Sequence, residues 1–355
     1  MSLPRRRATG GASLDREHGR IEMIHGSGGR ASAQLVDEIF LPAFDNEWLS
    51  PLGDQARVAL DKGFWSMTTD SYVITPYFFP GGDIGSLAVH GTVNDLAMGG
   101  AVPLYLTAAF ILEEGFPLKD LSRIANSMAS AARQAGIALV TGDTKVVEKG
   151  KGDGIYINTS GVGRIPEGVY LDPSRIRPGD AILLSGTIGD HGSAILAARE
   201  NWGLASSLQS DSAPLNSLVA CMVEEVPGLV CLRDPTRGGM ATVLNEWAWS
   251  AEVEIVIHEG RIPVREEVRG VCELLGLDPL YLANEGKLLA VCRAEDTERL
   301  LAVMKKHPRG RGSVIAGYVA EGASGERGGR VRMITSMGGV RMVDWLRGDP
   351  LPRIC

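Results

Sequence analysis

Three aspartates and one lysine in the first half of the chain have the types and spacing that a magnesium-bound phosphate requires. Asp70 stands at the exit of a strand-like run, Asp95 lies near the end of a predicted helix, and Asp143 lies at the outgoing end of another strand. Each alone fits a cap or turn equally well, but three together favour hard oxygen ligands for Mg²⁺. Lys145 points to the same strand face as Asp143 and could stabilise the charge that develops in phosphoryl transfer.

A glycine-rich run, HGSGG, occupies residues 25–29 and could fold around phosphate oxygens. Glycines that adopt positive φ let backbone N–H groups converge on an anion. The run lacks the Gly-Lys-Ser/Thr of a P-loop and the spacing of a dinucleotide site, so alone it fits a flexible linker too. The candidate phosphate contacts in it are His25, Gly26, Gly28 and Gly29.

Two motifs in the second half place polar groups in turns. DPTRGG offers the Thr236 hydroxyl, the Arg237 guanidinium and open backbone amides at a predicted helix N-terminus, which suits an anion. NEGK places Glu285 in a tight turn before a strand. An ordinary surface turn is an equal alternative for this motif.

The chain ends in PLPRIC, which leaves a thiol on its last residue, Cys355. Pro350 and Pro352 favour an extended segment that rises about 3.1 Å per residue and could reach a site outside its own domain. The adjacent α-carboxylate disfavours the thiolate, so activation would need positive charge from a site or a partner. We expect the other four cysteines to pack as small hydrophobes and to stay free, as in a reducing cytoplasm. They are Cys221, Cys231, Cys272 and Cys292.

Alternating strands and helices in both halves predict a two-domain α+β or α/β fold. In the first half, the patterns predict strands over 63–75, 105–115, 137–147 and 154–165, and helices over 85–98 and 118–137. In the second half they predict strands over 181–186, 253–257, 284–292, 313–319 and 330–335. Helices are predicted over 190–200, 214–225, 240–251, 263–276 and 295–306.

The predicted organisation has four parts. Residues 1–20 are expected to be a disordered arm, 21–166 an N-terminal α+β domain, 167–339 a C-terminal α/β domain, and 340–355 a mobile tail. A net charge of −7 gives no reason to expect nucleic-acid binding. No apolar window is long enough to span a membrane, which predicts a soluble protein. The odd number of widely spaced cysteines predicts a cytoplasmic location.

Seven motifs in order resemble the HypE family of carbamoyl dehydratases. They are HGSGG, TTDSYV, GTVNDLAMGGAVP, TGDTKVV, DPTRGG, NEGKLL and the terminal PRIC. The family belongs to an ATP-dependent superfamily that includes aminoimidazole ribonucleotide synthetase and selenophosphate synthetase. The resemblance covers about residues 21–355. The internal motifs indicate the superfamily, and the terminal cysteine indicates the HypE family within it.

The resemblance implies a fold, a reaction and partners. It implies homodimers whose N-terminal domains pair their sheets, with ATP near the dimer interface. A carbamoyltransferase, HypF, would load a carbamoyl group onto the terminal thiol, and Mg·ATP would drive its dehydration to a thiocyanate. The cyano group would then pass to iron held by a HypC–HypD complex for the nickel–iron hydrogenase centre.

The resemblance also implies residue roles. Cys355 would carry the group, Glu285 would accept protons, and Lys145 would hold the carbamoyl oxygen or the γ-phosphate. Asp70, Asp95 and Asp143 would serve the Mg²⁺ or phosphate site. Nucleotide contacts would come from Asn94, Thr144, Thr236, Arg237 and the residues of the glycine-rich run.

Two rival functions stay open at this stage. One is a sister synthetase acting on a small molecule, although selenophosphate synthetases carry a reactive Cys or selenocysteine near the glycine-rich loop and this sequence has none there. The other is a nucleotide-binding scaffold that presents its tail without catalysis.

Overall fold

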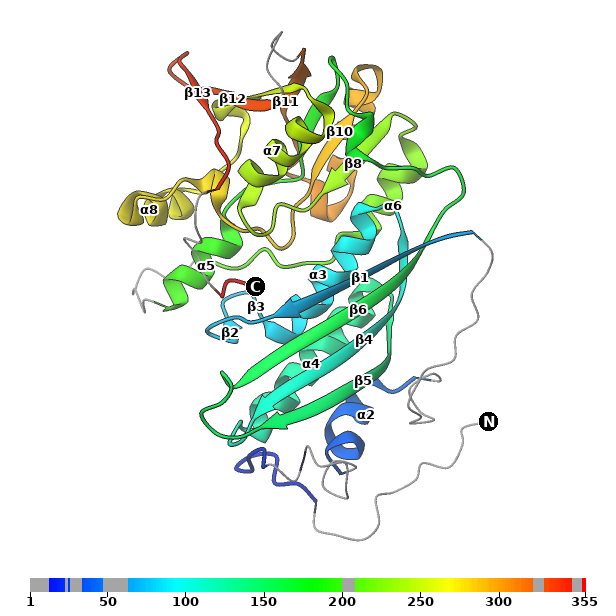
Figure 1. Cartoon of the computed structure of the whole chain (residues 1–355), viewed down its shortest axis with the longest axis vertical. Coiled ribbons are helices and arrows are strands. Elements are labelled where there is room, and N and C mark those ends of the chain that lie inside the picture. The colour runs from blue at the N-terminus through cyan, green and yellow to red at the C-terminus, as the bar shows by residue number, and fades with distance from the viewer. Residues whose placement is uncertain are drawn as a thin grey trace.

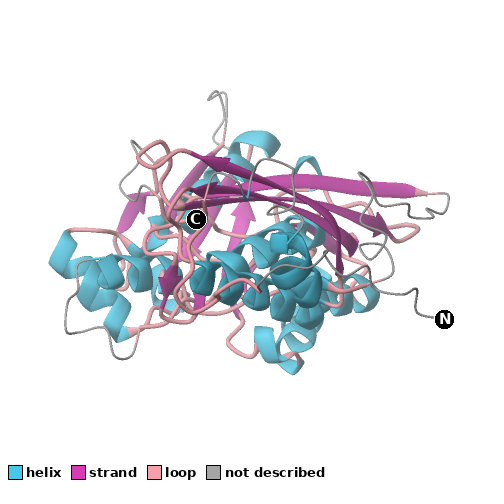
Figure 2. Cartoon of the chain, turned by 90° about the horizontal axis from the view of Figure 1, so that it is seen from below, coloured by secondary structure: helices cyan, strands magenta, loops and turns pink. Residues whose placement is uncertain are grey.

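The computed structural model describes residues 13–22, 25, 34–46, 63–199, 208–321, 329–346 and 353–355. They form two α/β domains, each built around its own sheet, as expected (Figure 1). The chain passes from one sheet to the other between Ile165 and Ala181. Figure 2 shows the longest strands lying above a layer of helices.

The N-terminal sheet has the strand order β1-β6-β4-β5. Its strands are β1 (Phe64–Tyr72), β4 (Val102–Glu113), β5 (Ala138–Val147) and β6 (Ile155–Ile165). β4 and β5 run parallel because the helix α4 (Leu118–Ala135) connects them, and the other neighbours are antiparallel. α4 and α3 (Ile84–Met98) pack on one face. Alternate side chains of β1 point to the opposite face, where Met67, Thr69 and Ser71 are exposed.

The helix α3 begins and ends where its sequence directs. Asp83 caps it by accepting hydrogen bonds from the amides of Gly85 and Ser86. The Asp83 amide in turn donates to the Ser86 hydroxyl oxygen, which completes a capping box. Nearly all of α3 is buried, since the sheet lies on one side of it and α4 and α6 on others. A Cβ at Gly91 would lie 2.2 Å from the Tyr72 hydroxyl, so this close helix–strand approach requires glycine.

The C-terminal sheet has seven strands in the order β13-β12-β9-β11-β7-β10-β8. They are β7 (Ala181–Leu184), β8 (Leu229–Arg233), β9 (Glu254–His258), β10 (Leu289–Cys292), β11 (Val314–Ala320), β12 (Arg330–Ile334) and β13 (Val340–Met342). The β12–β9 pair is parallel and the others are antiparallel, so the sheet is mixed.

Five helices accompany this sheet: α5 (Asp190–Arg199), α6 (Asn216–Glu225), α7 (Gly239–Ala251), α8 (Glu266–Leu275) and α9 (Thr297–Lys306). α7 packs on one face of the sheet, and α6 and α9 pack on the other. α5 and α8 instead contribute Ile195 and Val268 to the core cluster of the N-terminal domain. The two domains therefore share a continuous apolar core.

Buried Asn94 on α3 also joins the domains. Its Oδ1 accepts from the Leu215 amide at 2.8 Å, and its Nδ2 donates to the carbonyl oxygens of Ala213 at 3.1 Å and Glu285 at 3.4 Å. The Leu215 amide has no other hydrogen-bond partner among the described residues, and leaving a buried donor unpaired costs about 1–3 kcal/mol. The Glu285 carbonyl also accepts from the Ala213 amide at 3.2 Å. Asn94 thus holds two loops of the C-terminal domain against α3.

Both ends of the chain differ from the expectation. Residues 13–20, assigned to a disordered arm, lie on the N-terminal domain: Leu14 N donates to Glu38, and Arg20 forms a bridge with Pro117. Residues 340–346, assigned to a mobile tail, begin with β13 and continue with a buried Val343 that pairs with Val331. In both segments, backbone hydrogen bonds to the folded domains hold a stretch whose polar composition suggests disorder or mobility. Pro350 and Pro352 lie outside the described residues.

The predicted long elements are present, with boundaries that differ by a few residues. The sequence analysis misses β8, because a continuous apolar run has no alternation to mark a strand. It also misses the short elements η2 (Val36–Phe40), α2 (Leu41–Phe44), β2 (Phe78–Phe79) and β3 (Gly82–Asp83). All five cysteines are free, as expected. Among the described helices, none is long and apolar enough to cross a membrane.

Packing at two glycines predicts opposite stability changes. A Cβ at Gly161 would lie 2.8 Å from Leu96 Cδ1 and 2.9 Å from Leu106 Cδ2, so Gly161→Ala should destabilise the protein by about 1–3 kcal/mol. Gly270, inside α8, has nothing within 4 Å of its Cβ position, so Gly270→Ala should stabilise it by about 0.5–1 kcal/mol. Thermal melting of both variants checks the signs. A Gly161→Ala variant as stable as the parent would contradict the packing at the α3–sheet contact.

Candidate active site

The first part of the candidate site is a pair of carboxylates between β1 and α3. Asp70 and Asp95 lie close enough for their side chains to share a hydrogen bond. Thr68 Oγ1 donates to Asp95 Oδ2 at 2.8 Å, and the Tyr72 hydroxyl donates to Asp70 Oδ2 at 3.1 Å. Burial and then the Asp70 charge raise the pKa of Asp95 to about 6. The sequence analysis selected both aspartates, and the structure brings them together.

A third carboxylate, Asp234, completes this side of the site. It stands at the start of the DPTRGG loop, is 4% exposed, and is close enough to Asp95 and Asp70 to feel their charges. Burial, followed by the Asp95 charge, raises the pKa of Asp234 to about 7. The sequence analysis quoted the motif but selected only its Thr236 and Arg237.

Glu285 faces this group of aspartates from the turn before β10. It is 2% exposed, so the surface-turn alternative for NEGK is wrong. Burial, then the charges of Asp234, Asp211, Asp70 and Asp95, raises the pKa of Glu285 well above its usual value. Its Oε1 has no hydrogen-bond partner among the described residues. This oxygen of the buried carboxyl group is thus available to a substrate.

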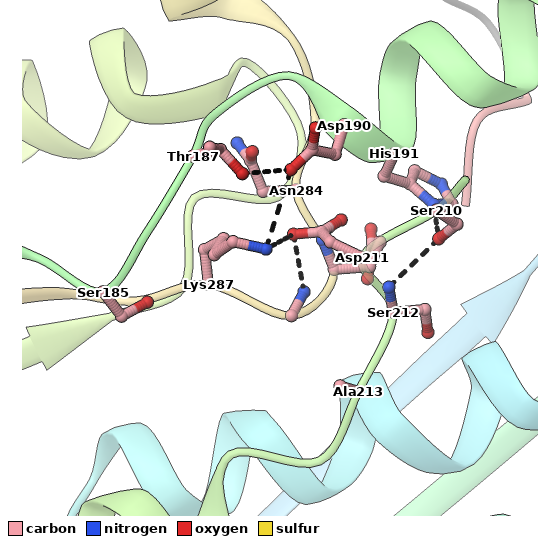
Figure 3. Close-up of polar contacts among 12 residues, drawn as sticks. Ser185, Thr187, Asp190, His191, Ser210, Asp211, Ser212, Ala213, Asn284 and Lys287 are labelled. Atoms are coloured by element: carbon pink, nitrogen blue, oxygen red, sulfur yellow. Dashed lines mark hydrogen bonds and ion pairs between the residues drawn. The ribbon is translucent and has the colours of Figure 1, made fainter. Parts of the chain in front are cut away.

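Asp211 holds the turn that carries Glu285. Its carboxylate accepts from the amides of Glu285 at 3.1 Å and Gly286 at 3.2 Å, and from Lys287 Nζ at 3.0 Å (Figure 3). Lys287 Nζ also lies 3.8 Å from Asp190. A Cβ at Gly286 would lie 1.8 Å from the Asp211 carbonyl oxygen, which explains the glycine in this turn. Nothing in the sequence pattern around Asp211 signals this function.

Cys355 lies in the same site, although it is the last residue of the chain. The Arg237 side chain hydrogen-bonds the thiol group, and Glu285 and Asp70 are near enough to act on it electrostatically. Burial and the Glu285 charge raise the pKa of Cys355 to about 11, against the lowering effect of Arg237. The docked surroundings therefore favour the thiol over the thiolate, with the Glu285 carboxyl nearby.

Asp143 and Lys145 are not part of this group within one chain. Asp143 is in register with Ala109, Asn158 and, on β1, Ser71. It therefore lies on the open sheet face, three strands or roughly 14 Å from β1. Lys145 shares its face, whereas Thr144 between them pairs with buried Phe110 on the helix side.

The other predicted nucleotide contacts lie in different places, and some are engaged with the protein itself. Asn94 is engaged with main-chain groups of the C-terminal domain rather than free for a ligand. The Thr236 amide bonds the Asp234 carbonyl, in the turn that leads into α7. His25 is buried and accepts from the Glu22 amide through Nδ1. Gly26, Gly28 and Gly29 lie outside the described residues.

Chemically, the site combines a thiol, a buried carboxyl group and an excess of carboxylates. Within the described ranges, no three His, Cys, Asp or Glu side chains form a complete metal-binding cluster. Mg²⁺ commonly takes only one or two protein carboxylates and completes its shell with water and substrate phosphates. The carboxylate group formed by Asp70, Asp95 and Asp234 fits such an ion, because a divalent cation would relieve its mutual repulsion.

Sequence profiles and curated relatives decide the family. The profiles of the AIR synthase related protein family match residues 53–165 for the N-terminal domain and 177–328 for the C-terminal domain. The carbamoyl dehydratase HypE of Azotobacter vinelandii is 59% identical over 342 residues, which cover 96% of this chain and 99% of the relative. The chain belongs to the HypE family of carbamoyl dehydratases. The HypE of Escherichia coli is 46% identical over 340 residues, covering 94% and 99%.

Solved HypE structures share this fold. A HypE structure described as a complex with ATP has a TM-score of 0.90 at 50% identity and covers 94% of this chain and 99% of that one. A HypE–HypF complex has a TM-score of 0.76 at 48% identity, covering 88% and 99%. The HypE architecture therefore extends over nearly the whole chain, including both domains that form the site.

The raised pKa of Asp234 predicts a pH-dependent stability effect. A carboxyl group whose pKa is raised on folding stabilises the protein at low pH and loses this contribution as pH rises through about 7. The asparagine in Asp234→Asn cannot ionise, so the variant's melting temperature should exceed that of the parent by more at pH 8 than at pH 5. Each kcal/mol of difference in the free energy of unfolding corresponds to about 2–4 °C. Melting without Mg²⁺ or nucleotide measures this.

The exposed Asp344→Asn variant is the matched control and should show no such difference. An Asp234→Asn variant whose melting temperature differs from the parent equally at both pH values would mean that Asp234 is ionised throughout. The inference that the three aspartates repel one another would then be wrong.

Proposed function

We propose that this protein uses ATP to dehydrate a carbamoyl group carried on Cys355 to a thiocyanate. The observation that carries the proposal is the docking of the Cys355 thiol against Glu285 and Arg237, beside three aspartates. A thiol needs no such carboxyl neighbour to act as a nucleophile, but a carbamoyl group on it does need a base. The placement thus suits chemistry performed on a group that the thiol carries.

The reaction balances as an activated loss of water. The carbamoyl oxygen takes the γ-phosphoryl group of ATP and ADP leaves; the C–O bond then breaks with release of phosphate while nitrogen loses two protons. Cys–S–C(O)NH₂ and ATP thus give Cys–S–C≡N, ADP and phosphate. Amide oxygen leaves poorly by itself, and phosphorylation supplies the leaving group. The site must therefore hold a phosphate, a cation near the oxygen and a base near the nitrogen.

Glu285 is the base in this proposal. Burial and the charges of the neighbouring carboxylates raise the pKa of Glu285 and so favour its protonated form. A cation held by Asp70, Asp95 or Asp234 would offset these charges and allow Glu285 to ionise in the loaded site. Bound there, Mg²⁺ would screen the phosphate charge that opposes transfer. The base would then be active only when the nucleotide is in place.

Lys145, Asp143 and the glycine-rich run complete the nucleotide site in this proposal, through a homodimer. β1 and β5 form the two edges of the described sheet, and exposed Met67 lies on its open face, being 78% exposed. Pairing β1 of one chain with β5 of its partner would close the two sheets into a barrel. It would also bring the partner's Asp143 and Lys145 beside the β1 strand that carries Asp70, which one chain alone does not achieve.

The partners follow from the chemistry of the carried group. HypF would load Cys355, consistent with the HypE–HypF complex among the related structures. A HypC–HypD complex would receive the cyano group on iron, in the cytoplasm. Both transfers require Cys355 to leave its buried position, whereas dehydration requires the docked position.

Mass spectrometry of the C-terminal peptide tests the function. After incubation with HypF and carbamoyl phosphate, the parent chain should gain one carbamoyl group on Cys355, then lose one water only when Mg·ATP is added. Glu285→Gln should load normally and dehydrate about 10²–10⁴-fold more slowly, because a general base contributes a factor of this size. The exposed Glu273→Gln variant serves as the control. A parent chain that loads and never loses water would be a scaffold.

Mixed dimers test whether Lys145 acts across the interface. Lys145→Ala and Glu285→Gln should each be inactive alone, yet a mixture should regain about a quarter of the parent's sites, since half the dimers are mixed and each has one intact site. Dehydration by the refolded or exchanged mixture measures this. A mixture as inactive as its components would place both residues in one chain's site.

A further inference from the structure

Residues 353–355 occupy a well-formed binding site between the two domains. The Ile354 side chain is 2% exposed and belongs to the core cluster that α5, α8 and the N-terminal domain share. Cys355 packs against the same cluster. The last three residues are therefore bound as a specific peptide, separate from the role of the thiol itself.

Each residue of this tripeptide has a main-chain oxygen that accepts a hydrogen bond. The Arg199 guanidinium donates to the Arg353 carbonyl. His191 Nε2 donates to the Ile354 carbonyl at 2.7 Å, and the Val73 amide donates to an oxygen of the Cys355 α-carboxylate at 3.2 Å. Recognition of consecutive main-chain carbonyls fixes the depth to which the peptide enters, and so the position of the thiol. His191 and Arg199 come from α5, whereas Val73 follows β1.

His191 is held ready to donate. A carbonyl oxygen only accepts, so Nε2 carries the hydrogen in this contact, and Nδ1 accepts from the Ser210 hydroxyl at 2.8 Å. The Ser212 amide in turn donates to Ser210 Oγ at 3.1 Å (Figure 3). Phe79 packs edge-on against the imidazole, with centroids 5.6 Å apart. The loop 210–212 thus fixes both the tautomer and the orientation of the fully buried ring.

Arg199 ties the peptide to both domains. Its Nε donates to the Thr75 carbonyl at 2.6 Å while the guanidinium reaches the Arg353 carbonyl. The Arg353 side chain pairs with Asp153 in the loop between β5 and β6. Arg353 has φ 55°, a left-handed conformation that a residue other than glycine keeps only where its surroundings impose it. The peptide is bound by contacts that cross the domain boundary.

We propose that His191 and Arg199 form the binding site for the chain's own Arg353–Cys355 segment and position the Cys355 thiol in front of Glu285. They are positioning residues, because they contact the backbone of the carrier peptide and neither its thiol nor the group it carries. The reaction that this positioning serves rests on the proposed function. The binding site itself rests on the contacts alone.

The rate of Cys355 alkylation tests the site in the full chain without partners. Iodoacetamide reacts with a thiol that is free of the site, and the mass of the C-terminal peptide over time gives the rate. Arg199→Ala should raise that rate roughly ten-fold, since it removes a charged hydrogen bond, and His191→Phe should raise it roughly five-fold. Half-buried Cys221, in the same sample, should react at an unchanged rate.

Two further variants separate loss of the binding site from a general change in the fold. Asp153→Asn, in the exposed loop between β5 and β6, should raise the Cys355 rate about two-fold without affecting the fold. Arg299→Ala, an exposed arginine on α9, is the matched control and should react like the parent. Parent-like rates in both Arg199→Ala and Asp153→Asn would overturn the site. An equal rise at Cys221 in Arg199→Ala would also overturn it, because general loosening would then explain the result.

A single-turnover assay separates positioning from the proposed function. With HypF and Mg·ATP, Arg199→Ala should load Cys355 at the parent rate and dehydrate it roughly ten-fold more slowly, with partial recovery in Arg199→Lys. Normal dehydration in Arg199→Ala would remove the positioning role. A parent chain that fails to dehydrate would refute the proposed function and leave the alkylation result intact.

Discussion

The site depends on one buried turn at the junction of the two domains. The Asp211 carboxylate accepts hydrogen bonds from the amides of Glu285 and Gly286. Asn94, on α3, donates to the Glu285 carbonyl. Because both contacts are to main-chain groups, they fix the position of Glu285 while leaving its Oε1 without a hydrogen-bond partner among the described residues. Any change in how the domains pack would move this carboxyl relative to Asp70 and Asp95, so the shared core is a requirement of the chemistry.

The same junction concentrates negative charge. Asp70, Asp95, Asp234 and Glu285 come from both domains, and burial raises the pKa of three of them. An arrangement of this kind costs stability unless a cation binds it. The cost is consistent with a site designed for a metal-bound nucleotide. It also couples the state of the base to the presence of that ligand.

The carrier role that we propose for Cys355 brings a second requirement, which is exchange between positions. In that role the thiol must be reachable for loading and transfer, yet the structure buries its neighbour Ile354 and provides a donor to a main-chain oxygen of each of the last three residues. Net hydrogen bonds contribute about 1 kcal/mol each, so a few such contacts hold a short peptide without making its release slow. A tripeptide bound through its backbone is well suited to this reversible docking.

The sequence by itself determined the long elements of both domains, the family and most of the chemistry-bearing residues. The spacing of apolar residues and the glycines after α3 are local signals, and motifs such as NEGK and DPTRGG name the residue types that the reaction needs. Only the tertiary structure decided which of them meet. Asp234 and Asp211 carry no local mark that separates them from turn aspartates, and His191 is an ordinary helix residue in sequence. Asp143 and Asp70 look equivalent in sequence, yet strand register places them on opposite sheet faces, because side-chain direction depends on pairing between strands distant in the chain.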